Sequence, residues 1–200
     1  MTWITSEEQL SAMFNAPAEA SLLKVARRLT PAYSRWIAAS RFCLLATVGP
    51  EGTDCTPRGD DGPVVQELDP GTLLMPDWRG NNRLDSLRNI VRDGRVSLSF
   101  LIPSSNTIVR VNGSARLSVD PAMIARFEQA GKHPKLVIVV AVTEVYTQCA
   151  RALIRAGLWS RDDAQGLPTP GDILSEMSQG TFDGAEYDQI WPARARETMW

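Results

Sequence analysis

The sequence is poor in the side chains that most metal sites and nucleophilic active sites require. It contains a single histidine, His133, and three cysteines, Cys43, Cys55 and Cys149, with no CxxC spacing. One imidazole excludes a multi-histidine metal centre, and a Ser-His-Asp or Cys-His system would have to use His133 in the turn-like segment 131–134. We expect no metal site, a solvated loop histidine, and reduced thiols rather than a disulfide framework.

A strong net charge and long apolar runs are also missing. The formal net charge is -2, which provides no electrostatic basis for binding nucleic acid or an anionic membrane. The longest apolar stretch, 136–142, is far shorter than the ~20 residues of a spanning helix. The start, MTWITSEEQL, does not have the pattern of a secretion signal. With 44% hydrophobic and 22% charged residues, the composition predicts a soluble, cytoplasmic domain with an ordinary core.

The first forty residues have helical patterns. Thr5-Ser6-Glu7-Glu8 is typical of a capping-box start. Apolar residues recur at helical spacing from Ala18 to Leu29, and Thr30-Pro31 can begin another helix that runs through Ile37. The sequence therefore predicts a helical segment over residues 1–40.

From Arg41 the periodicity changes to that of strands. Phe42, Leu44, Ala46 and Val48 form an apolar face, and a turn at 49–52 predicts a hairpin with 53–58. Further strands are expected at 64–68, 72–75, 96–102, 107–119 and 136–146, with a short helix from Asp120 to about Gln129. Closely spaced strands with hairpin turns favour a small, mainly-β barrel with flanking helices. No GxGxxG or GxxxxGK motif supports a Rossmann site or a P-loop.

The segment 76–90 carries the most informative chemistry. It leaves a strand, turns at Arg79-Gly80, and enters a helix that Asn81 or Asn82 can cap. The start of a helix favours a phosphate, and Arg79 and Arg83 could add charge-assisted contacts to it. The alternative is a capped surface helix with solvated arginines.

Two further segments are candidate ligand sites. In 55–62, Arg58 is followed by glycines that allow a flat ligand to approach the backbone, although the segment could equally be an acidic hairpin tip. In 146–159, a helix closed by Gly157 would place three polar side chains on one face: Gln148, Arg151 and Arg155. A solvated cationic stripe is the alternative there.

Together, four segments resemble pyridoxamine 5'-phosphate oxidase-related FMN-binding proteins. Residues 76–90, PDWRGNNRLDSLRNI, are similar to that family's signature PDRxGNxRLDSLxNI. Segments 57–60, 109–115 and 148–159 are also similar to the family pattern and occur in the expected order. The resemblance covers roughly residues 38–160.

The resemblance implies a mainly-β fold with flanking helices: a six-stranded, Greek-key split β-barrel of the FMN-binding type at 41–160. A helical N-terminal segment (1–40) would pack on the barrel, and a helical C-terminal segment (161–200) would follow it. FMN would lie in a groove shared by the two subunits of a homodimer. The implied FMN-binding residues are Arg58, Gly59, Asp77, Arg79, Asn81, Asn82, Arg83, Arg110, Gln148, Arg151 and Arg155. Of these, Arg110, Gln148, Arg151 and Arg155 would close the pocket, some from the partner subunit.

The implied function is that of an FMN-dependent oxidoreductase acting on a small-molecule substrate or electron donor. A non-catalytic flavin-binding module or redox sensor on the same fold is the alternative. Haem is a further alternative, for which only His133 could be an imidazole ligand. The stretch 190–200 does not align with the basic, tryptophan-containing end that binds substrate in pyridoxamine phosphate-oxidising enzymes, so that activity is not expected.

Overall fold

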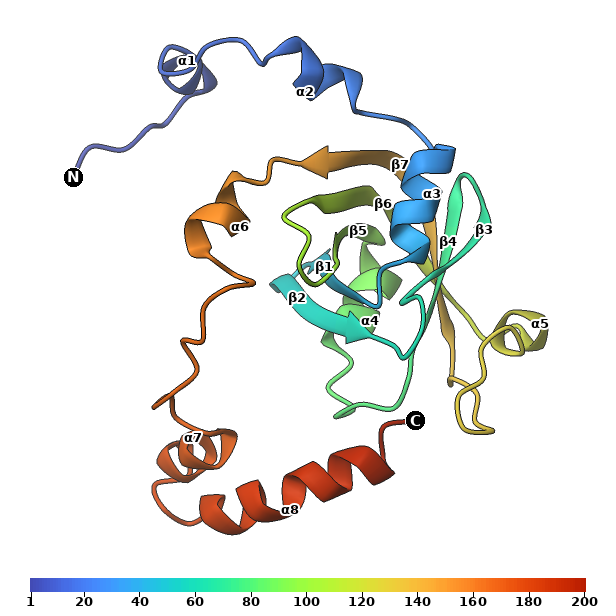
Figure 1. The fold of residues 1–200 in the computed structure, drawn as a ribbon, viewed down its shortest axis with the longest axis vertical. Helices are drawn as coiled ribbons and strands as arrows, with labels where there is room; N and C mark the ends of the chain where they lie inside the picture. Colours follow the sequence, from blue (N-terminus) through green and yellow to red (C-terminus); the bar gives the residue numbers. More distant parts are fainter.

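A computed structural model describes residues 1–200 and contains one antiparallel sheet with helices around it (Figure 1). The sheet has seven strands in the order β2-β1-β5-β6-β7-β4-β3. The strands are β1 (Phe42–Gly49), β2 (Gly52–Gly59), β3 (Gln66–Asp69), β4 (Thr72–Pro76), β5 (Arg95–Leu101), β6 (Ile108–Ser118) and β7 (Val137–Gln148). This confirms the mainly-β class and the seven strands that the patterns predicted, whereas the resemblance implied a six-stranded barrel.

Eight helices flank the sheet. They are α1 (Glu7–Ser11), α2 (Glu19–Leu23), α3 (Pro31–Ala38), α4 (Asp85–Arg92), α5 (Pro121–Ile124), α6 (Arg151–Ala156), α7 (Pro170–Met177) and α8 (Gly184–Glu197). In Figure 1, α1 and α2 lie at one end of the molecule, and α7 and α8 lie at the other. None of these helices has both the length and the apolar character needed to cross a bilayer.

Alternating side chains of the central strands form the core. Val96, Leu98 and Phe100 of β5 are buried, as the sequence predicted for the apolar face of this strand. β7 is covered on both faces from Val137 to Val140, which agrees with its apolar composition there, whereas Ala141 and Thr143 are exposed. The core therefore lies inside the curled sheet, and α4 packs against β1.

The face of β1 that enters the core differs from the prediction. Phe42 and Leu44 are exposed, whereas Cys43 and Leu45 are buried. Both faces of this strand are largely apolar, so alternation alone could not choose between them. Pairing with β5 determines which face of β1 is buried, because Leu45 lies opposite the buried Leu98 and residues that lie opposite each other share a face of the sheet.

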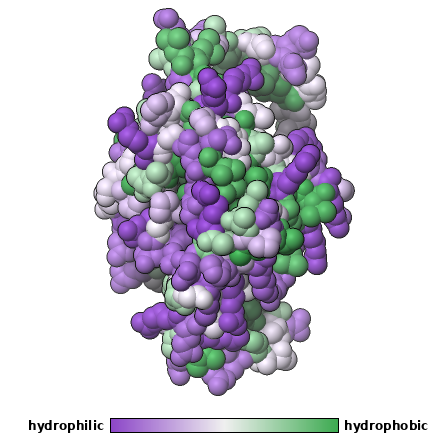
Figure 2. Space-filling model, turned by 90° about the vertical axis from the view of Figure 1, so that its right-hand side faces the viewer, coloured by the Kyte–Doolittle hydropathy of each residue, from purple (hydrophilic) through white to green (hydrophobic).

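The helix predicted over Ala18–Leu29 is much shorter in the structure. α2 ends at Leu23, and Ala26 instead exchanges two backbone hydrogen bonds with Val145 of β7, at 2.9 and 2.8 Å. Extended backbone on the sheet has replaced helical hydrogen bonds, and local helix propensity could not reveal that. Leu22 and Leu23 remain exposed, and apolar atoms are visible at this end of the molecule in Figure 2.

The sheet curls until its two ends approach each other, but its edge strands β2 and β3 do not pair. Arg58 on β2 instead bonds Asp77, which follows β4 near the opposite end of the strand order. A bulge at Asn112 and Gly113 shifts the register between β6 and β7. A side chain at Gly113 would collide with the carbonyl oxygen of Ala141, so glycine allows the strands to approach closely there.

Replacing a buried leucine of the β3–β4 hairpin should destabilise the fold far more than replacing an exposed one. Leu73 is 0% exposed, so Leu73→Ala should lower the free energy of unfolding by about 2–5 kcal/mol through lost contacts and a cavity. Leu68 is 45% exposed, and Leu68→Ala should change it by no more than about 0.5 kcal/mol. Urea unfolding followed by circular dichroism measures both, and equal effects would contradict the assigned faces.

Candidate functional site

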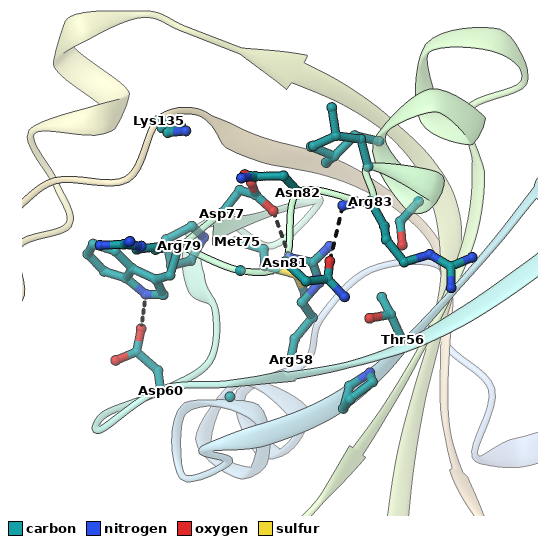
Figure 3. A pocket seen from close by; sticks show the side chains of 18 of the residues that line it. Thr56, Arg58, Asp60, Met75, Asp77, Arg79, Asn81, Asn82, Arg83 and Lys135 are labelled. Carbon is teal, nitrogen blue, oxygen red and sulfur yellow. Dashed lines mark hydrogen bonds and ion pairs between the residues drawn. The ribbon is translucent and has the colours of Figure 1, made fainter. Parts of the chain in front are cut away.

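A groove of about 1220 Å³ lies between β2 and the connection from β4 to α4 (Figure 3). β2 contributes residues 54–59 to its lining, and the β4–α4 connection contributes 77–84. The first turn of α4, the stretch before β7 at Lys135 and Leu136, and Met199 and Trp200 also line it, together with the residues after β2 and the end of β4: Asp60, Asp61, Val64, Met75 and Pro76. The volume is large enough for a ligand of mononucleotide size.

The β4–α4 connection enters the helix through two residues in the left-handed region. Asn82 has a φ of 60° and Leu84 has a φ of 63°, values that residues with a Cβ atom seldom adopt. Leu84 is the N-cap residue of α4, and no side chain caps the helix. The prediction that Asn81 or Asn82 caps it is therefore wrong. The Asn81 side chain instead accepts a hydrogen bond from the Arg83 amide, which stabilises the turn before the helix.

Two polar contacts fasten α4 to the sheet beneath it. The Ser86 hydroxyl donates to the Asp54 carboxylate at 2.5 Å, and the Asn89 side chain donates to the Thr47 hydroxyl at 3.0 Å. No side chain caps the first turn of α4, and the first residues of this helix, 85–87, line the groove. Such a helix start attracts anions.

An ion pair between Arg58 and Asp77 spans the inner part of the groove. The Arg58 Nη1 and Asp77 Oδ1 atoms are 2.6 Å apart, and the two side chains are only 20% and 16% exposed. The Nε of Arg58 is buried and has no hydrogen-bond partner. A buried donor without a partner is costly, so this atom is suited to an acceptor that a ligand would supply.

The remaining cations of the groove differ in how they are paired. Arg83 pairs with Asp85 at 2.9 Å, but the Arg83 side chain is 77% exposed, so this contact is weak and exchangeable. Arg79 and Lys135 have no carboxylate partner. The acidic residues of the groove are more numerous than its cations. Asp77 and Asp85 pair with arginines, whereas Asp54 and Asp60 have no cationic partner and accept hydrogen bonds from neutral side chains instead. The cations available to an anionic ligand are therefore Arg79, Lys135 and the exchangeable Arg83.

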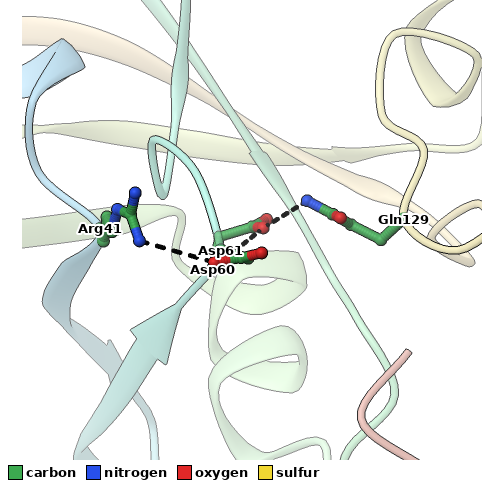
Figure 4. A network of polar contacts seen from close by, with 4 residues as sticks. All are labelled: Arg41, Asp60, Asp61 and Gln129. Atoms are coloured by element: carbon green, nitrogen blue, oxygen red, sulfur yellow. Dashed lines mark hydrogen bonds and ion pairs between the residues drawn. The ribbon is translucent and has the colours of Figure 1, made fainter.

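Asp60 organises the wall opposite Arg83. One carboxylate oxygen accepts from the Trp78 indole at 2.7 Å, and the other accepts from the Gln129 side chain at 2.8 Å and the Asp61 amide at 2.7 Å. Figure 4 shows Asp60 and Asp61 between Gln129 and Arg41, which pairs with Asp61 at 3.5 Å. These bonds fix the Trp78 ring at the groove.

The structure brings together seven of the predicted FMN-binding residues. Arg58, Gly59, Asp77, Arg79, Asn81, Asn82 and Arg83 all line the groove. The other four predicted residues, Arg110, Gln148, Arg151 and Arg155, do not line it.

These four lie around the ends of β6 and β7 and on α6. Arg110 places its guanidinium 5.3 Å from the centre of the Tyr146 ring. Gln148 belongs to β7 rather than to a helix with Arg151 and Arg155, so the single helical face that the spacing predicted is wrong. Gly157 does close α6, with a φ of 58°. The long strand continues to Gln148 because it pairs with β6 over that length.

Sequence reasoning missed Lys135, Met199 and Trp200 as groove residues. They approach it only through tertiary folding, from the stretch before β7 and from beyond α8. No local motif marks them. His133 lies outside the groove, and its Nδ1 is 2.6 Å from the Phe127 carbonyl oxygen. No cluster of three or more His, Cys, Asp or Glu side chains is arranged to hold a metal ion.

Comparison with known families identifies the class of this fold and groove. The family model described as pyridoxamine 5'-phosphate oxidase matches residues 29–149. The chain belongs to the pyridoxamine 5'-phosphate oxidase family. The matched residues include β1 through β7 and the loop from β4 to α4, and thus most of the groove. No curated protein matched the chain.

Several solved structures are similar to part of the chain. HupZ of Group A Streptococcus is 17% identical, with a TM-score of 0.49 over 60% of this chain and 93% of that one. A candidate pyridoxamine 5'-phosphate oxidase of Lactobacillus delbrueckii is 22% identical, with a TM-score of 0.48 over 60% and 95%. A protein named F420 reductase is 20% identical, with a TM-score of 0.44 over 58% and 98%.

The three thiols should differ sharply in reactivity. Burial raises the pKa of the Cys43 thiol to about 12, against the opposing effect of the Arg58 charge, whereas Cys55 and Cys149 are exposed. At pH 9, an ordinary thiol with a pKa near 9.0 is half ionised, but Cys43 stays neutral and shielded. Iodoacetamide followed by peptide mass spectrometry should label Cys55 and Cys149 in the folded chain and Cys43 only after unfolding. Equal labelling of all three would contradict the burial of β1.

Proposed function

We propose that this protein binds FMN with its phosphate at the uncapped start of α4, and that it functions as an oxidoreductase toward a small molecule. The observation that carries the proposal is that the helix start, Arg79 and Arg83 all line one groove. We further propose that the curled sheet is a split barrel of the family type and that the protein acts in the cytoplasm. Membership of the family supports a flavin as the cofactor.

The donors at the turn fit the charge of a phosphate. Arg79 has no carboxylate partner, and Arg83 can exchange its exposed contact with Asp85 for a charge-assisted contact with the phosphate. The Asn81 and Asn82 amides and the first-turn backbone amides of α4 supply neutral donors nearby. The unpartnered Nε of Arg58 lies further inside and would bond an oxygen of the same ligand. Gly59 and Asp77 complete this part of the lining.

FMN would supply the hydride or electron chemistry when bound. The protein would position the flavin and its reaction partner, exclude water, and set the local charge. No side chain needs to act as a nucleophile, which is compatible with the position of His133 away from the groove.

We also propose a homodimer in which two chains share each site. The cations Arg110, Arg151 and Arg155 and the Gln148 amide lie outside the groove of their own chain. A two-fold partner could bring these side chains to the open side of the groove.

Arg83→Ala should weaken FMN binding by about 1–3 kcal/mol, because it removes charge-assisted contacts to the phosphate. Riboflavin, which has no phosphate, should bind both proteins equally. Arg88→Ala is the matched control, because Arg88 is exposed on the same helix and does not line the groove. Quenching of flavin fluorescence measures each of these affinities. A wild-type chain that takes up no FMN would overturn the proposal.

The shared site predicts complementation between two defective chains. Arg83→Ala and Arg151→Ala should each weaken FMN binding when expressed alone. When they are co-expressed, a mixed dimer would carry one site with both changes and one site with neither. Titration of the purified mixed dimer should therefore show one site of wild-type affinity per dimer. If light scattering finds only monomers, the proposal that two chains share each FMN site is refuted.

The alternative function is a flavin-binding module or redox sensor without turnover. Stopped-flow absorbance of the FMN-loaded protein, mixed with NADH or NADPH under exclusion of oxygen, distinguishes the two. An oxidoreductase that uses either nicotinamide donor should lose its absorbance near the flavin maximum within seconds. A flavin that neither donor reduces would favour the non-catalytic module.

A further inference from the structure

The end of the groove opposite Arg83 is aromatic, and the chain's own Trp200 fills it. The Trp78 and Trp200 rings meet edge to face, with centroids 5.2 Å apart and planes at 74°. Aromatic rings favour this arrangement because the positive edge of one faces the negative face of the other. Met199 and Trp200 are also part of the groove lining, although they follow α8 and lie outside the segment that matches the family.

Trp78 is anchored by a hydrogen bond from its indole, whereas no hydrogen bond holds the Trp200 ring. The Trp78 indole donates to Asp60, which is itself fixed by the Gln129 side chain. Trp200 makes the ring contact with Trp78, and its main-chain oxygen accepts one hydrogen bond, from Lys132 Nζ at 2.9 Å. Met199 beside it is 50% exposed. The Trp200 ring can therefore leave without disturbing the core, while Trp78 stays in place.

We propose that Trp200 is a self-ligand in a subsite for planar aromatic rings, and that a ligand ring must displace it to stack against Trp78. The subsite is built from Trp78, Asp60 and Gln129 on the protein side. Because the subsite already holds the fused ring of Trp200, we expect its ligands to be planar aromatic rings. Two sources of such a ring fit this proposal, which rests on the proposed function: the isoalloxazine ring of FMN, or the ring of a reaction partner that binds after FMN.

Displacement can be followed at Trp200 itself. The chain has six tryptophans. Labelling with 5-fluorotryptophan gives one fluorine resonance for each, and the signal missing from Trp200→Phe identifies Trp200. If the flavin ring takes the subsite, FMN should move this resonance to the position of a solvent-exposed tryptophan. If a reaction partner takes it, FMN should leave the resonance in place, and free indole added to the FMN-loaded chain should move it.

Affinity provides the second measurement. Trp200→Ala removes the competing ring and should tighten binding of whichever ring takes the subsite by roughly three- to tenfold. Lys132→Met, which removes the hydrogen bond to Trp200, should act in the same direction but less strongly. Trp191→Ala is the matched control, because Trp191 lies on α8 outside the groove and stacks on Tyr187. Trp191→Ala should change the affinity for neither FMN nor indole.

The outcomes separate this proposal from the proposed function. If FMN binds but neither FMN nor indole moves the Trp200 resonance, the self-ligand proposal is overturned and FMN binding stands. If neither wild type nor Trp200→Ala binds FMN, the proposed function fails, and movement of the resonance by indole would still support the aromatic subsite. Weaker binding of both FMN and indole to Trp200→Ala would show that Trp200 helps to hold the ligand, which overturns the proposal.

Discussion

The contact between Arg58 and Asp77 bridges the two ends of this sheet. β2 is an edge strand, and β4 lies next to the opposite edge, yet their neighbourhoods are joined by an ion pair of 2.6 Å. Two nearly buried charges are stable together only if each remains paired, so the contact constrains the curl of the sheet. The groove is the space left where this curled sheet is bridged by side chains rather than closed by strand pairing.

The same constraint gives the groove two chemically different ends. Arg83 and the uncapped start of α4 lie at one end, where charge is exposed and exchangeable. Trp78 lies at the other end, fixed by Asp60 and covered by Trp200. A molecule with an anionic group at one end and a flat ring at the other matches this division, and FMN has that form. The family match supports the same class of ligand.

Local patterns predicted most helices and strands, but not always which face of a strand is buried or where a helix ends. The alternation in β5 correctly identified its buried face, because its other face is polar. In β1 both faces are apolar, so only pairing with β5 could select Leu45 for the core. The predicted helix over Ala18–Leu29 ended early because Ala26 bonds to β7, a competitor more than a hundred residues away in the chain. Hydrogen bonds to distant strands decide which face is buried and where the helix ends, and the residues of one short segment cannot reveal those bonds.

The sequence alone determined the mainly-β class, the family, and the segment 76–90 that turns into α4. These depend on periodicity, turn residues and a contiguous motif, all of which are properties of neighbouring residues. The tertiary structure decided that the helix start is uncapped, that Arg58 reaches Asp77, and that Lys135 and Trp200 complete the groove. The uncapped start follows from the left-handed backbone at Leu84. The other contacts join residues that are separated in the chain, and they exist because the sheet curls and brings its two ends together.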